Sequence, residues 1–147
     1  MIGSYVTRMQ LLPTGQVLFS DGSISQLWVY TPDGPPNPAL RPVVNKVVFN
    51  GGSSYTLTGK QLNGQSAGTA FGDDVENDSN YPVVLLRNAA GKAFYARTTN
   101  WSNTGVATGP MSETVDFTTP AGMPKGNYSL VVSGAGIISF PVAIAIR

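Results

Sequence analysis

The chain has 147 residues, of which 41% are hydrophobic and 12% charged, with a net charge of +1 and neither cysteine nor histidine. Disulfides, cysteine or histidine metal sites, thiol nucleophiles and imidazole bases are therefore excluded. The nine Lys and Arg are scattered, and no apolar run approaches the roughly 20 residues that span a bilayer, so we expect neither nucleic acid nor a membrane as a partner.

The first part of the chain, residues 1–40, predicts a β-hairpin followed by a linker. A turn signal at 13–15 precedes an expected strand over 17–19, and a second turn signal at 21–22 joins it to an expected strand over 25–30. An isolated hairpin is marginally stable in water and must pack on something. Four prolines then fall within seven residues after Thr31, which predicts a stiff linker and a domain boundary near residue 40.

The remaining residues, 41–147, show short apolar segments separated by turn signals, and no segment combines helix caps with helical periodicity. We expect strands over 45–49, 54–58, 83–87, 92–98, 113–118, 127–133 and 137–146. Close strand spacing of this kind predicts an all-β, immunoglobulin-like β-sandwich of about seven strands with an N-terminal β-hairpin.

Strand patterns also predict the core. Alternation places Val115 and Phe117 on one face of their strand, and Leu130 on the core face of another with Tyr128 and Val132. The continuous apolar run at 83–87 predicts a strand buried on both faces. Pro141 predicts an edge or a bulge in the last strand.

Several tracts resemble a known family, the C-terminal domain of galactose oxidase-like and glyoxal oxidase-like kelch proteins. These are Tyr55 to Gly64, Phe71 to Asp74, Asn80 to Val84, Gly105 to Gly109 and Gly126 to Val132. The resemblance implies an early-set immunoglobulin-like sandwich that packs against a β-propeller. Residues 12–18 and 27–32 look like the end of the last propeller blade. The family's copper oxidases use histidines, one of them from this domain, and this chain has none. We therefore expect no copper and no enzymatic activity.

An acidic tract holds half of the chain's eight carboxylates within six residues, at Asp73, Asp74, Glu76 and Asp78. Calcium takes six to eight oxygen ligands, which such a loop offers, although the spacing is not that of an EF-hand. The alternative is a solvated loop in which Asp and Asn cap turns. Calcium is the one cofactor that the sequence leaves open.

Aromatic residues suggest a second candidate site. A carbohydrate platform could be lined by five rings, Tyr81, Phe94, Tyr95, Trp101 and Tyr128. Trp101 lies in a polar loop and is the best exposed candidate, and its neighbours Asn100, Ser102 and Asn103 could bond sugar hydroxyls. The alternative is packing in the core or at an interface. Alternation places Phe94 and Tyr95 on opposite faces of one strand, so at least one of them is expected in the core.

The expected function is that of a non-catalytic structural or interaction module. It would pack against a β-propeller domain, or self-associate through the N-terminal hairpin, where Trp28 and Tyr30 lie on a strand with an unpaired edge. The alternative is a carbohydrate- or calcium-binding accessory module. We expect an extracellular or cell-envelope location, although the residues after Met1 do not form a signal peptide.

Overall fold

A computed structural model describes residues 7–22, 26–66 and 81–147. Within these ranges the chain is all-β, with one 3-10 turn at Pro38–Leu40. The strands are β1 (Arg8–Leu11), β2 (Val17–Ser20), β3 (Trp28–Tyr30), β4 (Val43–Gly51), β5 (Ser54–Lys60), β6 (Val83–Asn88), β7 (Ala93–Thr99), β8 (Glu113–Thr118), β9 (Gly126–Gly134), β10 (Ile137–Ile138) and β11 (Val142–Ile146). No helix in the described part of the chain is long and apolar enough to cross a membrane.

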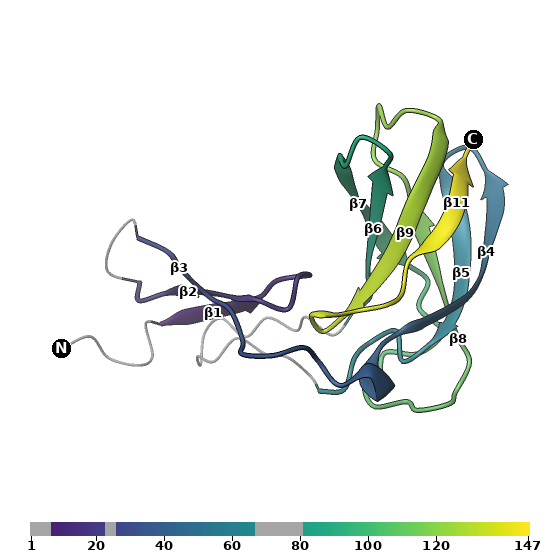
Figure 1. The fold of residues 1–147 in the computed structure, drawn as a ribbon. Helices are drawn as coiled ribbons and strands as arrows, with labels where there is room; N and C mark the ends of the chain where they lie inside the picture. The colour runs from purple at the N-terminus through teal and green to yellow at the C-terminus, as the bar shows by residue number, and fades with distance from the viewer. Residues whose placement is uncertain (1–6, 23–25, 67–80) are drawn as a thin grey trace.

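Strands β4 to β11 form a β-sandwich (Figure 1). One layer runs β4–β5–β8, and the other places β9 between β6 and the last strand, β11. Strand β7 joins the layers, because residues 93–96 pair with β6 and residues 97–99 pair with β8. Counted from β4, the first strand pairs the second, the second pairs the fifth, and the sixth lies between the third and the last. This is the strand order of the immunoglobulin-like sandwich.

The core lies between these layers and confirms the predicted strand phases. Val115 and Phe117 of β8, and Tyr128, Leu130 and Val132 of β9, are all buried. The Tyr55 and Phe117 rings stack with their centroids 5.1 Å apart. At a transfer free energy of about 25 cal/mol for each Å² of apolar surface buried, these side chains dominate the stability of the fold.

Strand β6 corrects one prediction. Residues 83–87 are not buried on both faces: Val84 and Leu86 are buried, whereas Val83 and Leu85 are half-buried and Arg87 is exposed. The outward face of β6 is shared with exposed Tyr95, which pairs with Leu85. Strand β6 is central in its sheet, between β7 and β9, but only its inward face is buried in the core, so a continuous run of Val and Leu did not indicate burial on both faces.

The last predicted strand, 137–146, is divided into β10 and β11. Pro141 lies just before β11, and its ring has no N–H to donate to a sheet ladder. Ser139, between the two strands, fills the gap: its N–H donates to the Val132 carbonyl at 2.8 Å, and its Oγ accepts from the Val132 N–H at 2.9 Å. The predicted irregularity at Pro141 is confirmed.

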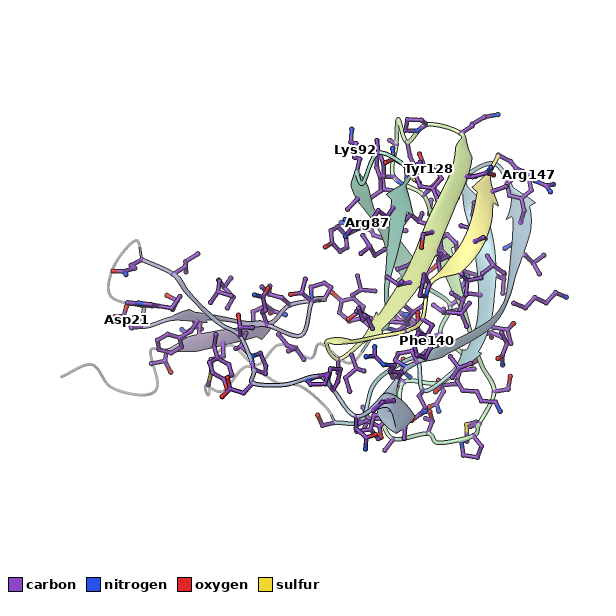
Figure 2. The ribbon with its side chains drawn as sticks, in the orientation of Figure 1. Asp21, Arg87, Lys92, Tyr128, Phe140 and Arg147 are labelled. Carbon is purple, nitrogen blue, oxygen red and sulfur yellow. The ribbon has the colours of Figure 1, made fainter. Side chains whose placement is uncertain are left out.

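A tyrosine corner closes the link between β8 and β9. The Tyr128 hydroxyl donates to the Pro124 carbonyl at 2.8 Å, and the Tyr128 ring packs edge-on against Phe94 at 5.9 Å. Figure 2 places Tyr128 at the end of the sandwich that also carries Lys92 and Arg147. A tyrosine at the start of this strand that bonds back to the preceding loop is a hallmark of immunoglobulin-like domains.

The N-terminal strands form a separate three-stranded sheet in the order β1–β2–β3, which extends away from the sandwich (Figure 1). The predicted hairpin is present, with Val17 opposite Tyr30 and Phe19 opposite Trp28. Strand β1, which pairs with β2, was not predicted, because Arg8–Leu11 contains no β-branched or aromatic residue.

The sheet meets the sandwich through the turn between β1 and β2. The Ser133 hydroxyl donates to the Pro13 carbonyl at 2.9 Å. Downstream of the sheet, the side chain of Asn37 caps the 3-10 turn by accepting from the Ala39 N–H at 3.0 Å. Arg41 then donates to the Ile138 carbonyl at 2.7 Å. The first contact ties the β1–β2 turn to the sandwich and the last ties the end of the linker to it. The domain boundary near residue 40 stays a prediction.

Candidate functional site

A groove of about 520 Å³ lies along the outward face of β7 and the loop that follows it. Three aromatic residues line the groove, and all are substantially exposed: Tyr81 51%, Tyr95 51% and Trp101 42%. The remaining lining residues are Pro82, Val83, Ala96, Arg97, Thr98 and Thr99. Exposed rings gathered in one hollow are unusual enough on a protein surface to mark a candidate binding site.

The period-two alternation of β7 sets which of its side chains reach the groove. Phe94, Ala96 and Thr98 point inward, and Phe94 packs against the core cluster. Tyr95 and Arg97 point outward. The expectation that Phe94 and Tyr95 lie on opposite faces, with one of them in the core, is confirmed.

Trp101 is held by a short chain of hydrogen bonds. Its indole N–H donates to Thr98 Oγ1 at 3.2 Å, and the Thr98 hydroxyl donates to the Pro82 carbonyl at 2.7 Å. The Trp101 ring then lies beside Tyr81, with the ring centroids 6.4 Å apart and the planes inclined by 48°. Thr98 is buried, so a ring in the groove is anchored to the body of the sandwich.

Asn100, predicted as part of the same site, does not line the groove. Its backbone is left-handed, with φ of 52°, and its amide donates to Asp116 Oδ2 at 2.8 Å. The Thr56 hydroxyl donates to the other carboxylate oxygen at 2.5 Å. The hydrogen bonds from Asn100 and Thr56 hold the pKa of Asp116 below its ordinary value, against a small opposing effect of burial. The Asn100 amide is thus bonded to β8 and points away from the groove.

The polar neighbours of Trp101 are likewise engaged within the loop. Ser102 Oγ accepts from the Thr114 N–H at 2.8 Å, and Asn103 Oδ1 accepts from the Gly105 N–H at 2.8 Å. Of the five predicted rings, the structure brings Tyr81, Tyr95 and Trp101 together in the groove, whereas Tyr128 lies in the core and Phe94 packs against it.

Arg97 is the residue that sequence reasoning missed. It is exposed on β7 and lines the groove, and its side chain makes no hydrogen bond or ion pair within the described ranges. A lone arginine in a strand is typical of a solvent-facing position, so its residue type alone does not indicate a binding site. Its spacing of two from Tyr95 was the available signal, because residues at i and i+2 share a face.

The predicted calcium ligands Asp73, Asp74, Glu76 and Asp78 lie outside the described residues, and the calcium site stays a prediction. In the part of the chain that the structure describes, no three acidic side chains are grouped so as to hold a metal ion.

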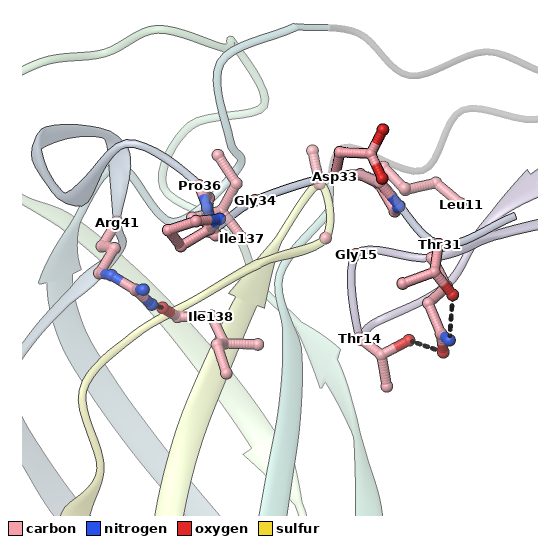
Figure 3. Close-up of a pocket in the computed structure, with 15 residues that line it drawn as sticks. Leu11, Thr14, Gly15, Thr31, Asp33, Gly34, Pro36, Arg41, Ile137 and Ile138 are labelled. Carbon is pink, nitrogen blue, oxygen red and sulfur yellow. Dashed lines mark hydrogen bonds between the residues drawn. The ribbon is translucent and has the colours of Figure 1, made fainter.

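A second crevice, of about 510 Å³, separates the three-stranded sheet and the proline-rich linker from the β9–β10 turn (Figure 3). Three of its polar side chains bond to one another: Thr14 donates to Gln16, and Gln16 donates to Thr31, each at 3.0 Å. Arg41 is bonded to the Ile138 carbonyl and lies over the Phe140 ring at 5.4 Å. None of the described residues that line this crevice is aromatic, and we interpret it as the seam between two packed parts.

A buried carboxylate anchors the loop after β5. Glu113 is 2% exposed, and its Oε2 accepts from the Leu62 N–H at 2.7 Å. The neighbouring Asn63 amide donates to the carbonyls of Asn103 and Gly105 at 2.8 and 3.0 Å. These bonds fix the loop to the segment that follows Trp101, so Glu113 supports the fold around the groove rather than lining it.

No protein-family model matches the chain, and no curated protein matches it either. The groove must therefore be judged on its own chemistry. Its rings can stack on a flat apolar face, and its arginine can pair with an anion.

Proposed function

We propose that this chain is a non-catalytic structural and interaction module, related to the C-terminal domain of kelch-type galactose oxidase-like proteins and located outside the cell or in the cell envelope. Its N-terminal sheet would pack against a propeller or a second copy. The observation that carries this proposal is the three-stranded sheet itself: not one residue of β1, β2 or β3 is fully buried.

The outer strand of this sheet is an exposed apolar edge. Leu27, just before β3, and Trp28, Val29 and Tyr30 within it are 60%, 38%, 53% and 60% exposed. The Trp28 ring lies beside the Phe19 ring, with the centroids 5.7 Å apart. Unpaired strand edges without charges invite pairing with another strand. Propeller blades have four strands. A fourth strand added beside β3 would pair its free edge, and a second layer packed on the sheet would cover its exposed apolar side chains.

Sedimentation analysis over a range of protein concentrations tests the proposal. We expect concentration-dependent self-association that is lost in the double variant Trp28→Ser, Tyr30→Ser. The control is Met111→Ser, which removes an equally exposed apolar side chain from a loop of the sandwich. A monomer whose β3 amides nonetheless exchange slowly with solvent would contradict the proposal, because the sheet would then be stable without a partner.

A second candidate is a carbohydrate-binding accessory module, favoured by the convergence of Tyr81, Tyr95 and Trp101 on one groove. A glycan array with the intact chain and with Trp101→Ala tests it, and binding that survives the substitution would count against the groove. A calcium-binding role through the acidic tract is tested separately: calcium should raise the melting temperature, and EDTA should lower it.

A further inference from the structure

We infer that the groove of Tyr81, Tyr95, Trp101 and Arg97 binds sugars that carry a carboxylate, the uronic acids, with the rings stacking on the sugar and Arg97 pairing with the carboxylate. This inference rests on the second candidate above, carbohydrate binding, and names the class of sugar.

The aromatic rings of the groove form an angled surface that is in place before a ligand binds. Tyr81 and Trp101 are inclined at 48°, which forms an open angle rather than a flat wall. Tyr95 adds a third ring from β7. The Trp101–Thr98–Pro82 hydrogen bonds fix the indole before any ligand arrives. A preformed surface loses little conformational entropy on binding, so more of the stacking energy contributes to affinity.

The second feature of the groove is its charge. Among the described residues that line the groove, Arg97 is the one that carries a charge, and within these ranges no hydrogen bond or ion pair engages its guanidinium. A guanidinium presents its N–H donors as a planar fork that matches a carboxylate and binds it through two parallel hydrogen bonds. The groove therefore complements an anion that is attached to a ring.

A nucleic-acid strand also combines rings with anions and is the competing ligand. Proteins that bind single strands use a basic groove that follows the phosphate backbone. The described lining of this groove contributes one cation, and the chain as a whole has a net charge of +1. The observations favour a sugar with a single carboxylate for each ring.

The experiment is isothermal titration of the intact chain with trimers of galacturonate, glucuronate and mannuronate. Each trimer is compared with its own methyl ester, which keeps the rings and linkages and masks the charge. We expect at least one free acid to bind about ten- to a hundredfold more tightly than its ester, as a charge-assisted hydrogen-bonded pair implies. The preference should shrink as salt is added.

Three variants identify the residues. Arg97→Gln should bring acid and ester to equal affinity, and Trp101→Ala should abolish binding of both. The control Arg87→Gln alters an exposed arginine of β6 that lies outside the groove and bonds to the Gly91 carbonyl, so it should leave binding unchanged. Thermal melts should show all three variants folded.

The possible failures are distinguishable. Equal binding of acid and ester in the unaltered chain would overturn the uronate inference and leave carbohydrate binding standing. The absence of binding to every trimer and ester would overturn the uronate inference, and carbohydrate binding as such would fall only if the glycan array were negative as well. Tighter binding of a single-stranded oligonucleotide, lost in Arg97→Gln, would overturn the inference in favour of nucleic acid.

Discussion

Gly15 and Gly136 lie back to back, so close that a Cβ on Gly15 would stand 2.9 Å from the Gly136 carbonyl oxygen. Both residues have positive φ, 85° and 79°. Gly15 belongs to the turn between β1 and β2, and Gly136 to the turn between β9 and β10. The three-stranded sheet thus contacts the sandwich at a point where neither of the two turns has room for a side chain.

Gly15→Ala should loosen the three-stranded sheet without unfolding the sandwich. The matched control is Gly91→Ala, because Gly91 has a φ of 81° and open space around it. Both variants carry the left-handed backbone penalty of about 1–2 kcal/mol, and only Gly15→Ala adds a backbone clash. We expect faster amide exchange in β1 and β2 for Gly15→Ala alone. Equal exchange in the two variants would show that the glycine contact does not hold the sheet.

Leu130→Ala should destabilise the sandwich by about 2–5 kcal/mol, because Leu130 is fully buried between the layers. Val115→Ala should cost less, since it removes fewer carbon atoms from an equally buried position. Val48, 41% exposed on β4, is the control and should change stability by no more than about 0.5 kcal/mol on truncation. Urea denaturation measures all three. An unchanged free energy of unfolding in both Leu130→Ala and Val115→Ala would refute the packing of β8 and β9.

Tyr128→Phe should cost about 1 kcal/mol, the net value of a hydrogen bond, because it removes the bond to the Pro124 carbonyl and keeps the buried ring. Tyr95→Phe is the control, since that ring is half exposed in the groove. Chemical denaturation of both variants separates the hydroxyl of the corner from a hydroxyl in solvent. A larger loss in Tyr95→Phe would be inconsistent with a tyrosine corner.

Asp116 should make a small contribution to stability that depends on pH. Its pKa is lowered in the folded state by the bonds from Asn100 and Thr56, so the contribution is complete above the unfolded value of about 3.9 and is lost as the pH falls through the folded value. Asn100→Ala should raise the pKa of Asp116 toward the ordinary value. An NMR titration of the carboxylate measures it, and an unchanged pKa would show that the amide bond is not its main cause.

Strand phases could be predicted from the sequence wherever alternation was clean, as at β8 and β9. The burial of β6 could not, because Val83 and Leu85 are apolar although they face outward and are only half-buried, and composition alone cannot show how much of that face is covered. Strand β1 was invisible for the opposite reason: Arg8–Leu11 owes its conformation to its partner β2. Tertiary pairing decides both cases.

The candidate site was predictable only in part. Trp101 and Tyr95 stand out as aromatic residues beside polar neighbours, but their convergence with Tyr81 depends on how β6 and β7 pair. The sequence placed Asn100 beside Trp101, and the left-handed turn at Asn100 sends its amide to Asp116 instead. Adjacent residues need not share a surface, whereas Tyr95 and Arg97, two apart on a strand, do.

The passage of β7 from one layer to the other has a mechanical consequence. A shearing force that pushes the two layers past each other must act along this single strand, because its first half is bonded to β6 and its second half to β8. Sliding of the layers would break the hydrogen bonds of one of these ladders, so β7 resists that movement. Tyr95 and Thr99 sit on either side of the crossover, and the width of the hollow between them is therefore fixed by an unbroken stretch of backbone.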